Sequence, residues 1–243
     1  MTMKIRADFD QRVVVLSGQE SWVASPTAGV ERQLLDRIGD EVARATSIVR
    51  FAPNAVFPEH VHHGGEEFFV LEGLFVDDDG AYPAGTYVRN PPGTRHAPRG
   101  GKDGATLLVK LYQFSAGDMT RVVVQTTETP WRPGSVPGLS VLPLHEFGAE
   151  HAALVRWAPN TQFHRHRHFG GEEIFVLSGV FRDEQGDYPA GSWIRSPHLS
   201  AHTPFTGSEG ATIFVKVGHL LLPQQPIGGK TPLHFDLRSH EHR

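Results

Sequence analysis

The stretch His60-Val61-His62-His63-Gly64-Gly65-Glu66 decides the fold of this chain, because the chain contains its pattern twice. The second copy runs from His166 to Glu172 and carries two histidines and a glutamate at the same positions. A further histidine follows thirty residues after each glutamate, at His96 and at His202. Each of these residues lies 106 positions from its counterpart, so neither copy contains an insertion here. Such an internal repeat predicts two domains of the same fold.

Three histidines and one glutamate at this spacing predict a metal site, because imidazole nitrogen and carboxylate oxygen suit divalent first-row metals. Two histidines separated by one residue on a strand point to the same face, and the glycines that follow permit a sharp bend before the glutamate. His63 is not expected to be a ligand, because its counterpart is Phe169. We predict one divalent metal per domain, with these ligands: His60, His62, Glu66 and His96 in the first, and His166, His168, Glu172 and His202 in the second.

These residues resemble the two sequence motifs of the cupin superfamily. The segment from His60 to Gly73 fits the first motif, and the segment from Gly85 to His96 fits the second. Asn54 stands where the first motif begins with glycine. In the second copy Pro197-His198-Leu199 replaces the turn Pro91-Pro92-Gly93. The resemblance implies an all-β fold of two tandem cupin barrels, which are jelly rolls also described as double-stranded β-helices.

The resemblance extends to a narrower group. The phrases Gly64-Gly65-Glu66-Glu67 and Asp79-Gly80-Ala81-Tyr82-Pro83-Ala84-Gly85 are similar to the cupin lobe of ChrR-type anti-sigma factors and of the cupin dioxygenases grouped with them. ChrR-type regulators hold their sigma factor through an N-terminal helical domain whose zinc site uses cysteines. This chain has no cysteine, and two barrels account for its 243 residues. We therefore do not expect it to bind a sigma factor.

The amino-acid composition argues against several classes of binding partner. The formal net charge is −4 and there is no basic block, so we expect neither nucleic acid nor an anionic membrane as a partner. No apolar run approaches the ~20 residues of a membrane span, and the first ten residues lack the apolar core of a signal peptide. We expect a cytoplasmic protein that forms a homodimer through barrel edges and binds a small molecule.

Short runs of apolar residues separated by glycine, proline and aspartate predict β-strands at residues 45–51, 67–72, 86–90 and 105–114, with equivalents in the second copy. Residues 31–45 also have the spacing of an amphipathic helix, but the matching stretch contains Pro143, which a helix interior excludes. We therefore predict strand, turn and strand there. The expected domains are residues 1–118, and residues 119–243 including a polar tail. His234, His240 and His242 lie in that tail and are not expected to be ligands.

Charged and aromatic residues inside the predicted strands have two interpretations. The first is structural: buried cations pair with carboxylates such as Glu67 and Glu173, because burying an unpaired charge is costly. The second is that they face the cavity and hold an anionic or enolate substrate near the metal. Under the second interpretation the substrate-binding residues are Lys110, Lys216, Arg89, Arg195, Tyr87 and Trp193.

Four protein ligands leave two open positions on a six-coordinate metal, which is what an oxygenase requires. The leading hypothesis is a mononuclear-metal oxygenase that acts on a diketone or hydroxyketone; no catalytic side chain is identified. The alternatives are a sensor without enzymatic activity, which binds a metal or ligand, and a structural bicupin that retains metal for stability. Ligand types alone do not choose among Fe, Zn, Ni and Mn.

Overall fold

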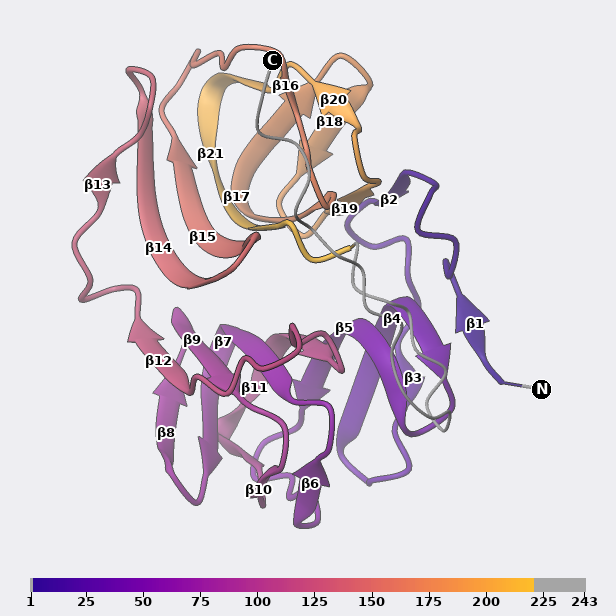
Figure 1. Ribbon diagram of the computed structural model, residues 1–243. Helices are drawn as coiled ribbons and strands as arrows, with labels where there is room; N and C mark the ends of the chain where they lie inside the picture. The colour runs from indigo at the N-terminus through magenta and orange to yellow at the C-terminus, as the bar shows by residue number, and fades with distance from the viewer. Residues whose placement is uncertain (1, 221–243) are drawn as a thin grey trace.

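The structure, a computed structural model, describes residues 2–220, so the three tail histidines lie outside the described residues. This part of the chain folds into two β-barrels, one above the other in Figure 1. No helix in it is long and apolar enough to cross a membrane. The prediction of an all-β fold with two similar barrels is confirmed.

The N-terminal barrel contains a nine-stranded sheet, which follows the order β1-β4-β5-β11-β7-β9-β12, with β3 beside β4 and β8 beside β7, and a separate pair formed by β6 and β10. Every pairing in it is antiparallel. The strands are β1 (Lys4–Ile5), β3 (Val23–Ala24), β4 (Val30–Gly39), β5 (Ala43–Phe51), β6 (His60–His62), β7 (Glu66–Asp77), β8 (Gly80–Pro83), β9 (Thr86–Asn90), β10 (Thr94–His96), β11 (Arg99–Leu111) and β12 (Val122–Gln125).

The C-terminal barrel repeats this arrangement in an eight-stranded sheet, which follows the order β13-β14-β15-β21-β17-β19-β2, with β18 beside β17, and in a pair formed by β16 and β20. The strands are β2 (Val13–Val15), β13 (Arg132–Pro133), β14 (Leu139–Phe147), β15 (Glu150–Trp157), β16 (His166–Arg167), β17 (Glu172–Asp183), β18 (Gly186–Pro189), β19 (Trp193–Ser196), β20 (Ala201–His202) and β21 (Phe205–Val217).

The two repeats exchange a strand. β2 belongs to the first repeat but pairs with β19, with Val15 opposite Trp193. β12 belongs to the second repeat but pairs with β9, with Val124 opposite Tyr87. Figure 1 shows β2 against the upper barrel and β12 against the lower one. β2 and β12 lie on opposite sides of the predicted division at residue 118, and each of them completes the barrel of the other repeat.

Alternation along the strands produces three apolar cores, because successive side chains point to opposite faces. Phe68 and Val70 lie inside the N-terminal barrel, and Ile174 and Val176 lie inside the C-terminal barrel. The intervening Phe69 faces outward and joins a third cluster that contains residues of both barrels. The third cluster packs the barrels against each other through their outer sheet faces.

The hairpin predicted from Pro143 is present in both barrels. β4 and β5 pair through a turn after Gly39, and β14 and β15 pair in the same way after Phe147. Each hairpin contains one irregularity, between Leu34 and Asp36 in the first and between Pro143 and His145 in the second. The helical spacing in residues 31–45 therefore reflects a strand with a bulge, which shifts the inward-facing positions by one residue.

Candidate metal centres

The first cluster of predicted ligands is assembled by the small sheet of the N-terminal barrel. β6 carries His60 and His62, and β10 places His96 directly opposite His60. The next strand begins at Glu66, after a bend at Gly65 with a φ of 76°. A Cβ at Gly65 would lie 2.5 Å from the Phe114 ring, so the bend needs glycine both for its backbone angle and for space.

The donor atoms of the first cluster converge. His62 Nε2 lies 2.9 Å from His96 Nε2, and Glu66 Oε2 lies 3.4 Å and 3.6 Å from these two atoms. His60, His62 and His96 each offer a nitrogen within 4.8 Å of the others. Two ligands on one ion, each at about 2.1 Å, are at most about 4.2 Å apart, so small side-chain movements bring all the donors onto one cation.

The second cluster has the same geometry. β16 and β20 place His166 opposite His202, and His166, His168, Glu172 and His202 offer donor atoms that all lie within 4.8 Å of one another. The ring centroids are 4.7, 4.9 and 4.8 Å apart, against 4.6, 5.0 and 4.8 Å in the first cluster. All four predicted ligands of the second cluster therefore meet in one group that could hold a metal, whereas in the first cluster such a group contains the three histidines, with Glu66 close to His62 and His96.

The altered turn of the second repeat keeps the backbone path of the first. Leu199 takes a φ of 61° where Gly93 takes 90°. Leu199 N donates to His168 O at 2.9 Å, just as Gly93 N donates to His62 O at 2.9 Å. A left-handed conformation at a leucine costs about 1 kcal/mol or more. The second repeat tolerates this cost, and the turn still delivers His202 to the cluster.

The unpaired atoms of both clusters fit a cation. Glu66 Oε2, His168 Nε2 and Glu172 Oε2 are buried and have no hydrogen-bond partner among residues 2–220. Buried polar atoms without partners are costly in an ordinary core, and one cation in each cluster would satisfy them. The outer ring nitrogen of His60 lies 2.9 Å from Pro58 O, and that of His166 lies 3.1 Å from His164 O. Such contacts fix the other nitrogen, Nε2, toward the centre, as is usual for metal-binding histidines.

The third histidine of each cluster contacts an aspartate. The sequence analysis predicted neither of these two aspartates. His96 Nδ1 lies 2.9 Å from Asp77 Oδ2, and His202 Nδ1 lies 3.3 Å from Asp183 Oδ2. Both carboxylates are buried at the ends of long strands, β7 and β17. They too lie 106 positions apart, so the signal in the sequence is a carboxylate that both repeats share at this offset.

Burial lowers the pKa of three candidate histidine ligands, His62, His166 and His168, whereas for His96 the hydrogen bond to Asp77 and the nearby carboxylate charges together outweigh burial and raise the pKa. Desolvation lowers the pKa of His62, and desolvation together with His202 and His166 lowers the pKa of His168 to about 3. Desolvation also raises the pKa of Glu172 to about 7. Neutral imidazoles keep their nitrogen lone pairs available for a metal at neutral pH. A cation would in turn favour the ionised form of the glutamate.

The second cluster opens onto an apolar cavity of about 380 Å³ in the C-terminal barrel. Its wall includes Val141, Trp157, Phe163 and Phe181, and its polar lining beyond the four candidate ligands is Ser135 and Arg167. A volume of this size holds a small organic molecule. A molecule in this cavity would lie beside the histidines and the glutamate.

The six residues expected to bind substrate lie elsewhere. They are buried between the barrels, because each alternates along its strand with residues that face a barrel interior. Lys110 Nζ lies 2.7 Å from Glu173 Oε2 of the other barrel, and Lys216 contacts Glu67 in the reciprocal way. None of the six lines the cavity of the C-terminal barrel, and all six have partners in the layer between the barrels, as the structural interpretation expects: Lys110, Lys216, Arg89, Arg195, Tyr87 and Trp193.

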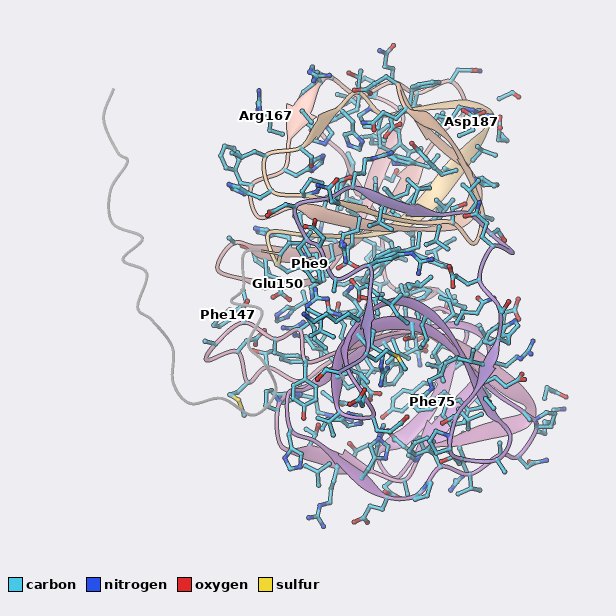
Figure 2. All side chains as sticks on the ribbon, turned by 90° about the vertical axis from the view of Figure 1, so that its right-hand side faces the viewer. Phe9, Phe75, Phe147, Glu150, Arg167 and Asp187 are labelled. Carbon is cyan, nitrogen blue, oxygen red and sulfur yellow. The ribbon has the colours of Figure 1, made fainter. Side chains whose placement is uncertain are left out.

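The remaining four of these residues belong to the same network between the barrels. Arg89 binds Glu67, Asp118 and Glu150, and Tyr87 donates to Glu67 at 3.0 Å. Lys216 and Arg89 lower the pKa of Glu67 to about 2, although burial alone would raise it. Arg195 binds Asp36 at 2.8 Å, and Trp193 donates to Glu173 at 3.2 Å. Figure 2 shows Glu150 and Phe9 in this layer, whereas Phe75 lies within the lower barrel.

Two β-barrels in tandem, each with three histidines and a glutamate gathered beside its small sheet, define a bicupin. The chain belongs to the ChrR Cupin-like domain family, whose model matches residues 10–115 and 119–221. The two matched segments follow the two repeats. A search of curated proteins finds none that matches this chain.

Several solved structures share the fold. A proposed dioxygenase from Nostoc punctiforme has a TM-score of 0.72 at 16% identity, covering 92% of this chain and 88% of its own. A proposed glyoxylate-induced protein from Pseudomonas aeruginosa has a TM-score of 0.69 at 18% identity, with coverage of 89% and 90%. An oxalate decarboxylase from Bacillus subtilis has a TM-score of 0.59 at 14% identity, with coverage of 84% and 76%. At these identities the likeness concerns the fold alone.

Proposed function

We propose that this bicupin is a metal-dependent enzyme of the oxygenase type, which acts on a small chelating substrate such as a diketone or hydroxyketone. The observation that carries the proposal is the second cluster, because its histidines and glutamate open onto an apolar cavity that can hold a small molecule. The names of similar structures point the same way: one is a proposed dioxygenase, and another acts on oxalate, itself a small chelating dicarboxylate.

The chain's own residues would perform the binding and positioning. His166, His168, Glu172 and His202 would hold the metal, and Trp157 with the other apolar residues of the cavity would exclude water from the substrate. When bound, a divalent iron or similar metal would supply a Lewis acid with open positions for a chelating substrate and dioxygen. Among the described residues that line the cavity there is no lysine, and Ser135 has no hydrogen bond to a histidine that would activate it.

A second candidate function is a regulatory sensor, which the likeness of the chain to the ChrR Cupin-like domain favours. In that case the metal or a small ligand would change how the barrels contact a partner, without turnover. Metal identity and oxygen uptake distinguish the two functions. Tightly bound iron with oxygen uptake on a diketone supports the enzyme, whereas zinc without turnover supports the sensor.

The first test is elemental analysis of protein purified without chelators. We expect about two equivalents of divalent metal per chain, about one after His62→Ala or His168→Ala, and none after both substitutions. The matched control is His63→Ala, which removes an exposed histidine adjacent to the ligands and should leave the metal content unchanged. Unchanged metal in the double variant would refute the metal centres.

The second test is an oxygen-electrode screen of the iron-loaded protein against small diketones and hydroxyketones. We expect uptake that disappears in His168→Ala. A substitution in the cavity wall, Val141→Phe, should reduce uptake while leaving metal content unchanged, because it fills space beside the metal without removing a ligand. Absence of uptake with every substrate, in protein that retains its iron, would favour the sensor.

A further inference from the structure

The exchanged segment brings an arginine to the C-terminal metal centre. Arg12 immediately precedes β2, and its Nη2 lies 2.9 Å from Asp183 Oδ2. The same oxygen lies 3.3 Å from Nδ1 of His202. Arg12 Nη2 also donates to the Tyr188 hydroxyl at 2.7 Å, and that hydroxyl donates to Asp183 Oδ1 at 2.7 Å. A residue from the other repeat therefore competes with a metal-binding histidine for one carboxylate oxygen.

The N-terminal centre lacks this competition. Arg121 is the counterpart of Arg12, but its Nη2 lies 2.8 Å from Asp79 and does not contact Asp77. Among the described residues no arginine pairs with Asp77, and His96 Nδ1 lies at the shorter distance of 2.9 Å from Asp77 Oδ2. The sequence explains the difference, because the counterpart of Asp79 is the neutral Gln185, which offers Arg12 no carboxylate.

A carboxylate that accepts a hydrogen bond from a metal-binding histidine orients the ring and makes it a stronger ligand. An arginine on the same oxygen neutralises the carboxylate and weakens that hydrogen bond. Arg12 also adds a positive charge near the position of the cation, which opposes cation binding. Its side chain is largely buried, at 22% exposed, and the Asp183 side chain is 1% exposed, so water screens the effect little.

We propose that Arg12 is a positioning residue, which weakens the C-terminal metal site by withdrawing Asp183 from His202, so that one chain contains a tighter N-terminal site and a weaker C-terminal site. The inference rests on the proposed metal centres and assigns them unequal affinities. The weaker site is the one that opens onto the cavity. Arg12 therefore makes the site beside the cavity the one that fills at the higher metal concentration.

Zn²⁺ titration of chelator-stripped protein by calorimetry tests the inference in two single-site backgrounds. His62→Ala leaves the C-terminal site, and His168→Ala leaves the N-terminal site. In the His62→Ala background, Arg12→Gln should lower the Zn²⁺ Kd about 10-fold, and Asp183→Asn should raise it about 10- to 100-fold. Arg12→Lys keeps the charge and should retain a Kd closer to that of the parent.

The matched control is Arg121→Gln in the His168→Ala background, which should leave the Kd unchanged because Arg121 binds Asp79. A second route avoids removing Arg12: Gln185→Asp offers it a competing carboxylate and should also tighten the C-terminal site. A merely structural role for Arg12 predicts weaker or unchanged binding after Arg12→Gln, and either result would overturn the inference. Absence of Zn²⁺ binding in both backgrounds would instead refute the metal centres themselves, and the inference with them.

Discussion

Lys110 and Lys216 each reach across the molecule to a glutamate of the other barrel. Glu173, the partner of Lys110, immediately follows Glu172, a candidate metal ligand, and adjacent side chains on a strand point to opposite faces. One residue of the pair therefore faces the cluster, and the next holds the barrels together. Chain spacing predicted that both glutamates and both lysines lie on strands, but it did not specify which face each lysine occupies.

Lys110→Met should destabilise the folded protein by about 3 to 5 kcal/mol, because it leaves Glu173 buried with fewer cationic partners. Denaturant unfolding measures the loss. The control is Lys102→Met, an exposed position on the same strand, where the expected change is below about 0.5 kcal/mol. Weaker substrate binding with unchanged stability in Lys110→Met would instead indicate that this lysine faces a substrate cavity.

Residue types and spacing predicted the eight candidate ligands, because cupin-type ligands follow one another at fixed distances along the chain. The residues that support them could not be predicted in this way. Arg12 and Asp183 are 171 positions apart, and nothing in the local sequence around either one indicates the other. Their contact exists only because β2 leaves its own repeat.

At the scale of secondary-structure elements, the exchange of strands between the two repeats could not be predicted from the sequence. Residues 13–15 and 122–124 read as ordinary apolar strands, and the hydrophobic pattern of a strand specifies which face is buried but not which neighbour it joins. The hairpin in residues 31–45 was predictable, because a proline in the second copy excluded the helix that the first copy permits.

Val15→Asp should destabilise the C-terminal barrel more than the N-terminal barrel. Val15 is 4% exposed and lies opposite Trp193 of β19, so an aspartate there would place an unpaired charge in the cluster between the barrels. We expect a loss of roughly 3 kcal/mol or more. Hydrogen exchange should become faster in β19.

The control is Val123→Asp, which alters an exposed valine on the other exchanged strand and should change exchange little. If the amides of β19 remained protected in Val15→Asp while β4 and β5 lost protection, the assignment of β2 to the C-terminal barrel would be wrong.

At the scale of the whole molecule, the repeat predicted two barrels of the same fold, and the structure adds that they are interdependent. Reciprocal strands and reciprocal ion pairs cross the boundary between them. Either barrel alone would lack an edge strand and would leave charged groups such as Lys110 without their partners. The sequence could not reveal this dependence, because each repeat carries a complete set of strands.

Residues 1–118 and residues 119–243, produced separately, should therefore each fold poorly, and mixing them should restore native structure. Near-ultraviolet circular dichroism and size-exclusion chromatography measure the recovery, and metal content in the mixture should return to about two equivalents per pair of fragments. Cooperative unfolding of residues 1–118 alone, at the denaturant midpoint of the intact chain, would contradict the interdependence.

Because β2 pairs with a strand of the other repeat, the two barrels are completed at different times during translation. The partner of β2, β19, is synthesised about 180 residues after it, which corresponds to roughly 10 to 40 s of translation at ~5–20 residues per second. The N-terminal barrel obtains its last strand once residue 125 has emerged, whereas the segment that carries Arg12 must wait for most of the chain. The two centres therefore mature in sequence during synthesis, and the one beside the cavity is completed last.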